Sequence, residues 1–161
     1  MANALRIQLQ PSGWQVLRGR KLAWPVGNAS SGIGKHFPGM QTDIELVHFG
    51  QKVKLVIDTK FTHIFTSSQY KTDLLKSGYL YQLYAYLRTQ EEHASYRGIE
   101  RSEGMLLHPQ CGQAIDEYVD IQGHRMRFKT IDLKSIPEKF EWQLLHIRSE
   151  DEYDAEKIVE Q

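Results

Sequence analysis

Residues 42–60 read TDIELVHFGQKVKLVIDTK. Polar and apolar side chains alternate over residues 42–49, as they do in a strand with one buried face, and the run 52–57 predicts a second strand. Gly50 and Gln51 supply the turn between the two. The segment therefore predicts a β-hairpin in which Asp43 begins one strand and Asp58 follows the end of the other.

The triplet Asp58-Thr59-Lys60 completes this hairpin. Side chains two residues apart in a strand point to the same face, so Asp58 and Lys60 are expected to project together, with Thr59 turned the other way. In an antiparallel hairpin around Gly50, Asp43 lies near the same end of the ladder as Asp58. Two carboxylates are thus predicted to converge beside one ammonium group.

Two carboxylates held close together repel each other, and a divalent cation removes that cost. Mg²⁺ suits such a site because it binds one or two carboxylates together with waters and substrate phosphate. We expect Asp43, Asp58 and the carbonyl of Thr59 to hold the metal, and Lys60 to orient or deprotonate the attacking water. The pattern favours phosphodiester hydrolysis with Asp43, Asp58 and Lys60 as catalytic residues. The alternative is a surface ion pair at a strand end.

A helix is predicted to begin near Thr72 or at Ser77 and to end near Arg88. Gln82 and Tyr86 are four residues apart and share one face of it. Gln82 interrupts an apolar stripe, so we expect it to act as an auxiliary catalytic group beside the carboxylates or a DNA phosphate, with Tyr86 contacting DNA. The alternative is that Gln82 simply reaches solvent at the edge of that face.

The rest of the chain predicts strands at residues 14–17 and 104–108, and a hairpin of residues 114–121 and 124–133 around Gln122 and Gly123. Residues 135–138 (SIPE) match a capping box that opens a last helix. This order predicts a mixed α+β fold, an α/β arrangement with a central sheet flanked by helices. Residues 1–149 are expected to form one domain, and the acidic residues 150–161 a frayed tail.

Charge is unevenly distributed along the chain. No acidic residue precedes Asp43, whereas 20 acidic residues follow from there on. The bases in this acid-free stretch are Arg6, Arg18, Arg20, Lys21 and Lys35. A basic segment beside an acidic body can bind a polyanion, or it can simply be solvated. Lys35 is a candidate for lining a DNA groove, and Arg125 and Arg127 are candidates for phosphate contacts, with a solvated face as the alternative.

Two further features concern the compartment. No apolar run approaches the roughly 18 residues that span a bilayer, so no membrane association is expected. The single cysteine, Cys111, cannot form an internal disulfide, and a cytoplasmic location is expected.

Together these residues resemble the PD-(D/E)XK nucleases. Asp43 matches the first acidic position, residues 58–60 match the (D/E)XK triplet, and residues 82–86 (QLYAY) match the QxxxY element of the RecB-like branch. Four blocks resemble the McrC family of McrBC restriction systems more closely: MQTDIEL (40–46), VIDTKF (56–61), YLYQLYAYL (79–87) and GMLLHP (104–109). The resemblance implies a restriction-endonuclease-like fold and a Mg²⁺-dependent DNA endonuclease subunit. It also implies a partner, the McrB-like AAA+ GTPase that recognises methylcytosine-containing DNA.

The chain departs from the family in one respect. Family members carry a Glu-bearing helix ahead of the first strand, whereas no acidic residue precedes Asp43 here. We therefore expect a nuclease domain that is short at its N-terminus. The alternative is a truncated, catalytically inactive subunit that binds DNA or the AAA+ partner without cutting.

Overall fold

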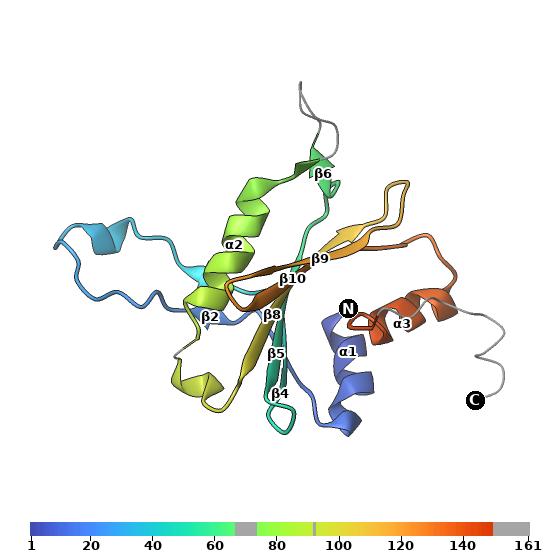
Figure 1. Ribbon diagram of the computed structural model, residues 1–161, viewed down its shortest axis with the longest axis horizontal. Helices are drawn as coiled ribbons and strands as arrows, with labels where there is room; N and C mark the ends of the chain where they lie inside the picture. Colours follow the sequence, from blue (N-terminus) through green and yellow to red (C-terminus); the bar gives the residue numbers. More distant parts are fainter. Residues whose placement is uncertain (67–73, 92, 150–161) are drawn as a thin grey trace.

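A six-stranded mixed sheet lies between helices that cover both of its faces (Figure 1). The computed structural model describes residues 1–66, 74–91 and 93–149. Helix α2 covers one face of the sheet, and helices α1 and α3 lie together on the other. The predicted mixed α+β class, with a central sheet flanked by helices, is confirmed.

The regular elements follow one another along the chain in a strands–helix–strands–helix order after a short first helix. The α-helices are α1 (Ala2–Leu9), α2 (Ser77–Arg88) and α3 (Pro137–Leu145), and the 3₁₀ helices are η1 (Gln10–Ser12), η2 (Ile33–Lys35) and η3 (Ala94–Tyr96). The strands are β1 (Gln15–Arg18), β2 (Lys21–Leu22), β3 (Met40–Gln41), β4 (Ile44–His48), β5 (Val53–Thr59), β6 (Phe65–Thr66), β7 (Leu74–Leu75), β8 (Arg101–Pro109), β9 (Asp116–Ile121) and β10 (His124–Ile131).

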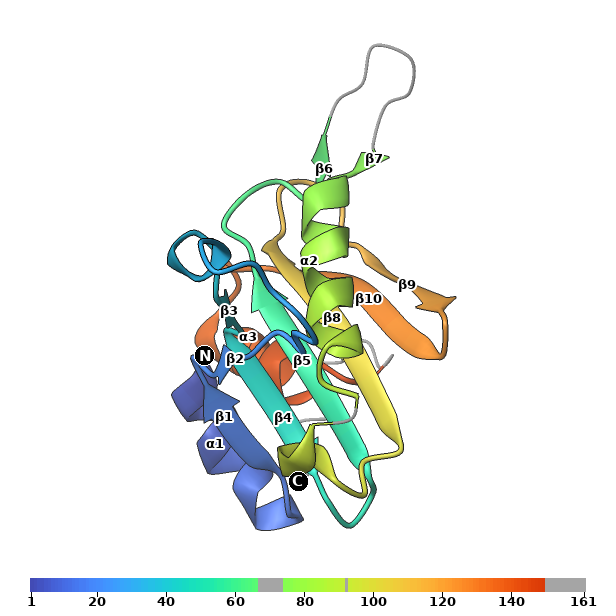
Figure 2. The same ribbon diagram turned by 90° about the vertical axis from the view of Figure 1, so that its left-hand side faces the viewer.

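The strand order of the main sheet is β1-β4-β5-β8-β10-β9, and its central strands lie side by side beneath α2 in Figure 2. Strands β4 and β5 pair antiparallel with Ile44 opposite Ile57, so the predicted hairpin is confirmed. Strand β8 pairs parallel with β5, and α2 makes the crossover between them. The hairpin of β9 and β10 is also confirmed. The parallel pairing brings the carboxyl ends of β5 and β8 to one edge of the molecule.

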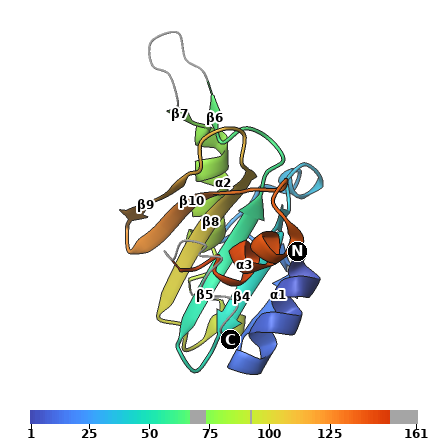
Figure 3. The same cartoon turned by 90° about the vertical axis from the view of Figure 1, so that its right-hand side faces the viewer.

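Alternate side chains of the central strands feed two apolar cores. Leu55, Ile57 and Met105 pack in the core beneath α1 and α3, which lie in front of the sheet in Figure 3. Val56 and Leu106 pack in the core beneath α2. Both faces of β5 are covered. Lys54 and Asp58, which point to the same face as Val56, are therefore buried on the side of the sheet that α2 covers.

Three local predictions change. Helix α1 was not predicted; it buries Ala2 and Leu5 against the sheet. Helix α2 begins at Ser77, which resolves the choice between the two predicted starts in favour of the later one. The capping box over residues 135–138 is wrong, because the Ser135 hydroxyl donates to Asp132 O instead of capping the helix, whose N-cap is Ile136.

Two segments lie outside the main sheet. Strands β2 and β3 pair only with each other, and residues 23–39 between them extend away from the sheet, closed at the base by a 2.8 Å hydrogen bond from Trp24 Nε1 to Pro38 O (Figure 1). The predicted tail, residues 150–161, lies outside the described residues. In the part of the chain that the structure describes, no helix has the length and apolar character needed to cross a membrane.

Candidate active site

Asp43 and Asp58 meet at the carboxyl end of β5. The register pairs Ile44 with Ile57, so Asp43 and Asp58 follow one residue beyond that pair at the same end of the hairpin, as the sequence predicted, and the charge of Asp43 acts on Asp58. Asp43 Oδ2 accepts hydrogen bonds from Thr59 N at 2.8 Å and from Thr59 Oγ1 at 2.6 Å. Thr59 was predicted to turn away from Asp58 and Lys60, and its hydroxyl reaches Asp43 at the end of β5. Thr59 therefore fixes the orientation of the Asp43 carboxylate.

The Asp58 carboxylate is buried, with 3% of the residue exposed, and it faces Lys60 as predicted. Lys60 Nζ lies 2.7 Å from Asp58 Oδ2. Burial raises the pKa of Asp58 despite the contact with this ammonium, and the nearby charge of Asp43 raises it further. The site thus holds a carboxylate whose charge the single lysine does not fully compensate.

A chain of hydrogen bonds connects Lys60 to helix α2. Lys60 Nζ donates to Gln82 Oε1 at 2.8 Å, Gln82 Nε2 donates to Tyr86 OH at 2.8 Å, and Tyr86 OH donates to Gln41 O at 2.9 Å. Gln82 is exposed at the edge of the helix, as the alternative interpretation expected, and it also contacts Lys60; its auxiliary catalytic role stays a prediction. Tyr86, predicted to contact DNA, is 4% exposed and acts as an internal link of this chain.

Tight packing holds α2 in the position that these hydrogen bonds require. Leu83, one residue from Gln82, is fully buried against the sheet, and it packs directly over Gly104 of β8. A Cβ at Gly104 would lie 2.8 Å from Leu83 Cγ, a separation that side chains do not tolerate. The glycine therefore allows the close approach of helix and sheet that brings Gln82 to Lys60.

Two aromatic side chains that sequence reasoning left out also border the site. Lys60 Nζ lies 4.8 Å from the centroid of the Tyr79 ring, and that ring lies 6.0 Å from the ring of His108. His108 is 1% exposed, its Nδ1 lies 2.8 Å from Thr62 O, and its Nε2 has no hydrogen-bond partner among the described residues. Burial lowers the pKa of His108, which favours the neutral form of the ring. His108 lies here because β8 pairs parallel with β5, and no local sequence pattern predicts that pairing.

The other predicted DNA contacts lie elsewhere. Lys35 is exposed in η2, within the extended segment of residues 23–39. Arg125 and Arg127 project from β10 to the face opposite Asp58, since Met126 and Phe128 between and beyond them pack under α2. Both are engaged in ion pairs, Arg125 with Asp120 and Arg127 with Asp116. The structure does not bring these three bases to the candidate active site.

The chemistry of the donors is compatible with a divalent cation. Asp58 Oδ2 is buried and receives no hydrogen bond of standard geometry from the described residues, although Lys60 lies close to it. Over residues 1–66, 74–91 and 93–149, no group of three or more His, Cys, Asp or Glu side chains comes together as a metal site. The described residues thus offer two carboxylates, a set that Mg²⁺ accepts when water and phosphate oxygens complete its coordination.

No protein-family model matches this chain, and no curated protein matches it with significant sequence similarity.

Proposed function

We propose that this protein is the Mg²⁺-dependent DNA endonuclease subunit of a modification-dependent, McrBC-like restriction system. The observation that carries the proposal is the convergence of Asp43, Asp58 and Lys60 at one strand end, with Lys60 in contact with both Asp58 and Gln82. This arrangement supports hydrolysis of a phosphodiester bond. The four sequence blocks that resemble McrC support the choice of restriction system.

Different residues of the site would have different roles in such a reaction. Asp43, oriented by Thr59, and Asp58, whose charge Lys60 compensates only in part, would hold the cation. Bound Mg²⁺ would lower the pKa of a coordinated water and stabilise negative charge on the phosphate. Lys60, held by Gln82 and the face of Tyr79, keeps an ammonium beside Asp58, where it can orient a water and neutralise charge that develops on the phosphate.

The partners follow from the same proposal. DNA is the substrate, and a McrB-like AAA+ GTPase supplies recognition of methylcytosine and couples it to cleavage. Such a system acts on DNA in the cytoplasm. Residues 1–42 carry five bases and no acid, an excess of positive charge that favours a polyanionic substrate.

A second candidate function has its own observation. The described residues supply two carboxylates and not three at the centre. A catalytically inactive subunit that binds DNA or the AAA+ partner without cutting would need no complete metal site.

Plasmid cleavage tests the first proposal directly. The protein is incubated with methylated and unmethylated plasmid, with Mg²⁺ or with Mg²⁺ and EDTA, and with or without a McrB-like partner. We expect nicking or linearisation that EDTA abolishes and that Asp58→Ala and Lys60→Ala reduce by about 10²–10⁴-fold. The matched controls are Glu117→Gln and Lys134→Ala, which change an exposed acid and an exposed base away from the site.

The outcomes separate the candidates. Equal cutting by the wild type and both site variants would show that the site assignment is wrong. A chain that binds DNA or the GTPase but cuts under none of the conditions would favour the inactive subunit. Calorimetric titration with Mg²⁺ supplies an independent readout, since Asp43→Asn and Asp58→Asn should each weaken binding if these carboxylates hold the ion.

A further inference from the structure

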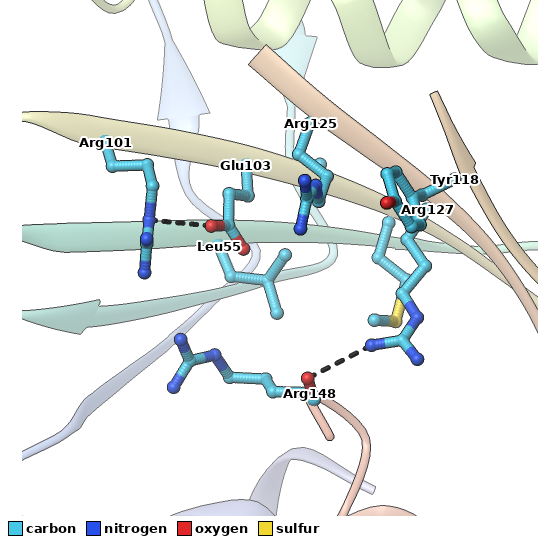
Figure 4. Close-up of a pocket in the computed structure, with 9 residues that line it drawn as sticks. Leu55, Arg101, Glu103, Tyr118, Arg125, Arg127 and Arg148 are labelled. Atoms are coloured by element: carbon cyan, nitrogen blue, oxygen red, sulfur yellow. Dashed lines mark hydrogen bonds and ion pairs between the residues drawn. The ribbon is translucent and has the colours of Figure 1, made fainter. Parts of the chain in front are cut away.

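A second polar site lies on the other face of the sheet, beneath α1 and α3. A pocket of about 190 Å³ opens there between β8, β10 and the chain that follows α3 (Figure 4). Its floor is Leu55 and Met105, which belong to the core opposite α2. Leu55 and Asp58 are three residues apart in β5 and therefore point to opposite faces, so this pocket is separate from the candidate active site.

Arginines dominate the wall of the pocket. Four of them line it with a single carboxylate, namely Arg101, Arg125, Arg127, Arg148 and Glu103. Two of these bases pair with acids of β9: Asp120 pairs with Arg125, and Asp116, which also pairs with Lys129, pairs with Arg127. The remaining two share one acid, because Glu103 pairs with Arg101 at 2.8 Å and acts on Arg148 only through space. Among the residues that the structure describes, one positive charge is left over at that end of the pocket.

Arg148 is the residue that points to a ligand. Its guanidinium carbon lies 4.2 Å from the centroid of the Trp14 ring, and its Nε is buried without a hydrogen-bond partner among the described residues. Burial lowers the pKa of Arg148, and the nearby charge of Arg101 lowers it further. A partly buried guanidinium whose Nε donor is unused and whose neighbour carries a like charge is costly, and a bound anion would reduce that cost.

We propose that this pocket binds a small phosphate anion, either inorganic phosphate or a phosphate monoester, through Arg148 and Arg101. Figure 4 shows both guanidinium groups to the left of Leu55, that of Arg101 beside Glu103 and that of Arg148 below it. A guanidinium presents parallel N–H donors that match the spacing of phosphate oxygens. The size of the pocket suits a small anion, since drug-sized ligands occupy pockets of roughly 300–1,000 Å³. The site is independent of the proposed nuclease function.

The proposal is tested by titrating the full chain with inorganic phosphate at constant ionic strength. The arginine Nε–Hε resonances are followed in ¹⁵N-labelled protein, and affinity is measured by calorimetry. We expect the Arg148 and Arg101 resonances to shift and saturate, while that of Arg18, an exposed arginine of β1, stays unchanged. Arg148→Gln and Arg101→Gln should each weaken binding at least about tenfold, and the control Arg18→Gln should not.

Folding of the variants is controlled separately, because Arg148 stacks on the buried Trp14. Arg101 is well exposed, so Arg101→Gln tests the site without disturbing the core. The absence of a saturable shift at Arg148, or equal weakening by Arg18→Gln, would overturn the proposal.

Further titrations distinguish the source of the phosphate. Methyl phosphate tests a monoester against inorganic phosphate, and tighter binding of the ester would identify a phosphorylated metabolite as the ligand. A short unphosphorylated DNA duplex is the third probe. If the duplex shifts Arg148 and neither small phosphate does, the surface binds nucleic acid and the proposal fails.

Discussion

Asp43 Oδ2 accepts two hydrogen bonds from a single residue, the backbone N–H and the hydroxyl of Thr59, at 2.8 and 2.6 Å. This pair links the start of β4 to the end of β5 at the point where Asp58 also projects. The orientation of one proposed metal ligand therefore depends on a neighbour that is next to the other ligand in the chain.

Removing the Thr59 hydroxyl tests this dependence. Thr59→Val keeps the branched shape and loses one of the two donors to Asp43, so we expect Mg²⁺ affinity to fall about 10–100-fold, as it does when partners that orient metal ligands are removed. Thr59→Ser restores the donor and should restore most of the affinity. Calorimetric Mg²⁺ titrations of the three proteins measure the effect. Unchanged affinity in Thr59→Val would show that Asp43 does not depend on Thr59 for binding the ion.

The ionised Asp58 side chain, a proposed Mg²⁺ ligand, is predicted to lower the stability of the protein at neutral pH. Its pKa is raised by burial, so the folded state holds the proton more tightly than the unfolded chain does. The contribution of Asp58 to stability is therefore greatest below its ordinary pKa of 3.8 and is lost as pH rises through the raised pKa. Asp58→Asn mimics the neutral acid, so it should raise the free energy of unfolding at about pH 7 and abolish cleavage.

Urea unfolding at about pH 7 and about pH 4 in the absence of Mg²⁺ measures this effect. The advantage of Asp58→Asn should shrink at the lower pH. The exposed Asp120, whose pKa is lowered by its hydrogen bonds from Arg125, provides the control, and Asp120→Asn should bring no gain. A less stable Asp58→Asn protein at neutral pH would mean that the ion pair with Lys60 outweighs the cost of burial.

The sequence predicted the site's carboxylates for a physical reason. A hairpin register follows from local alternation and a short turn, so the approach of Asp43 to Asp58 follows from residues 42–60 alone. Lys60 and Gln82 were predicted from spacing within one strand and one helix, and the structure joins them by a 2.8 Å hydrogen bond. Their catalytic roles stay predictions.

What the sequence could not provide were contacts between distant segments. His108 borders the site because β8 pairs parallel with β5, and no local sequence pattern predicts that pairing. The helix α1 was missed because its sequence, ANALRIQL, carries no strong cap and buries few residues. Arg125 and Arg127 were predicted as phosphate contacts because they alternate, but the acids that neutralise them stand on the neighbouring strand β9.

Gly104 is predicted to control how closely α2 packs against the sheet. A methyl group there would lie 2.8–3.0 Å from the Leu83 side-chain carbons, so Gly104→Ala should displace the helix. We expect the free energy of unfolding to fall by about 1–3 kcal/mol, as in other overpacked cores. Because Gln82 adjoins Leu83, cleavage should fall as well. Gly34→Ala, where the added methyl group meets no atom within 4 Å, is the control in urea unfolding and cleavage assays.

If Gly104→Ala is as stable as the wild type, the helix has room to move and the close contact does not hold Gln82 in place. The companion variant Leu83→Ala then tests whether the Leu83 side chain is in close contact with residue 104. In the Gly104→Ala background the smaller side chain should relieve the clash, so the double variant should lose less stability than the sum of the two single variants.

Lys54 is predicted to make the stability of the protein rise with pH in mildly alkaline solution. It is 1% exposed, and its ammonium lies 3.8 Å from the centroid of the Tyr96 ring. Burial lowers the pKa of Lys54 to about 8. The negative charge of Glu45 acts to raise this pKa, and the positive charge of Arg20 acts to lower it. Between about pH 8 and pH 10.5 the unfolded chain thus binds more protons than the folded one, and stability increases with pH across this window.

Lys54→Met, which keeps the length of the side chain without its charge, should abolish this rise. The full rise corresponds to about 3 kcal/mol for a shift of this size, and part of it should be visible between about pH 7.5 and pH 9.5 by urea unfolding. Measurements stop there because Tyr96, whose pKa is raised by burial, opposes the trend at higher pH. The exposed Lys134→Met is the control and should keep the wild-type slope. A wild-type slope in Lys54→Met would mean that Lys54 stays charged in the folded protein, with Glu45 compensating it through space.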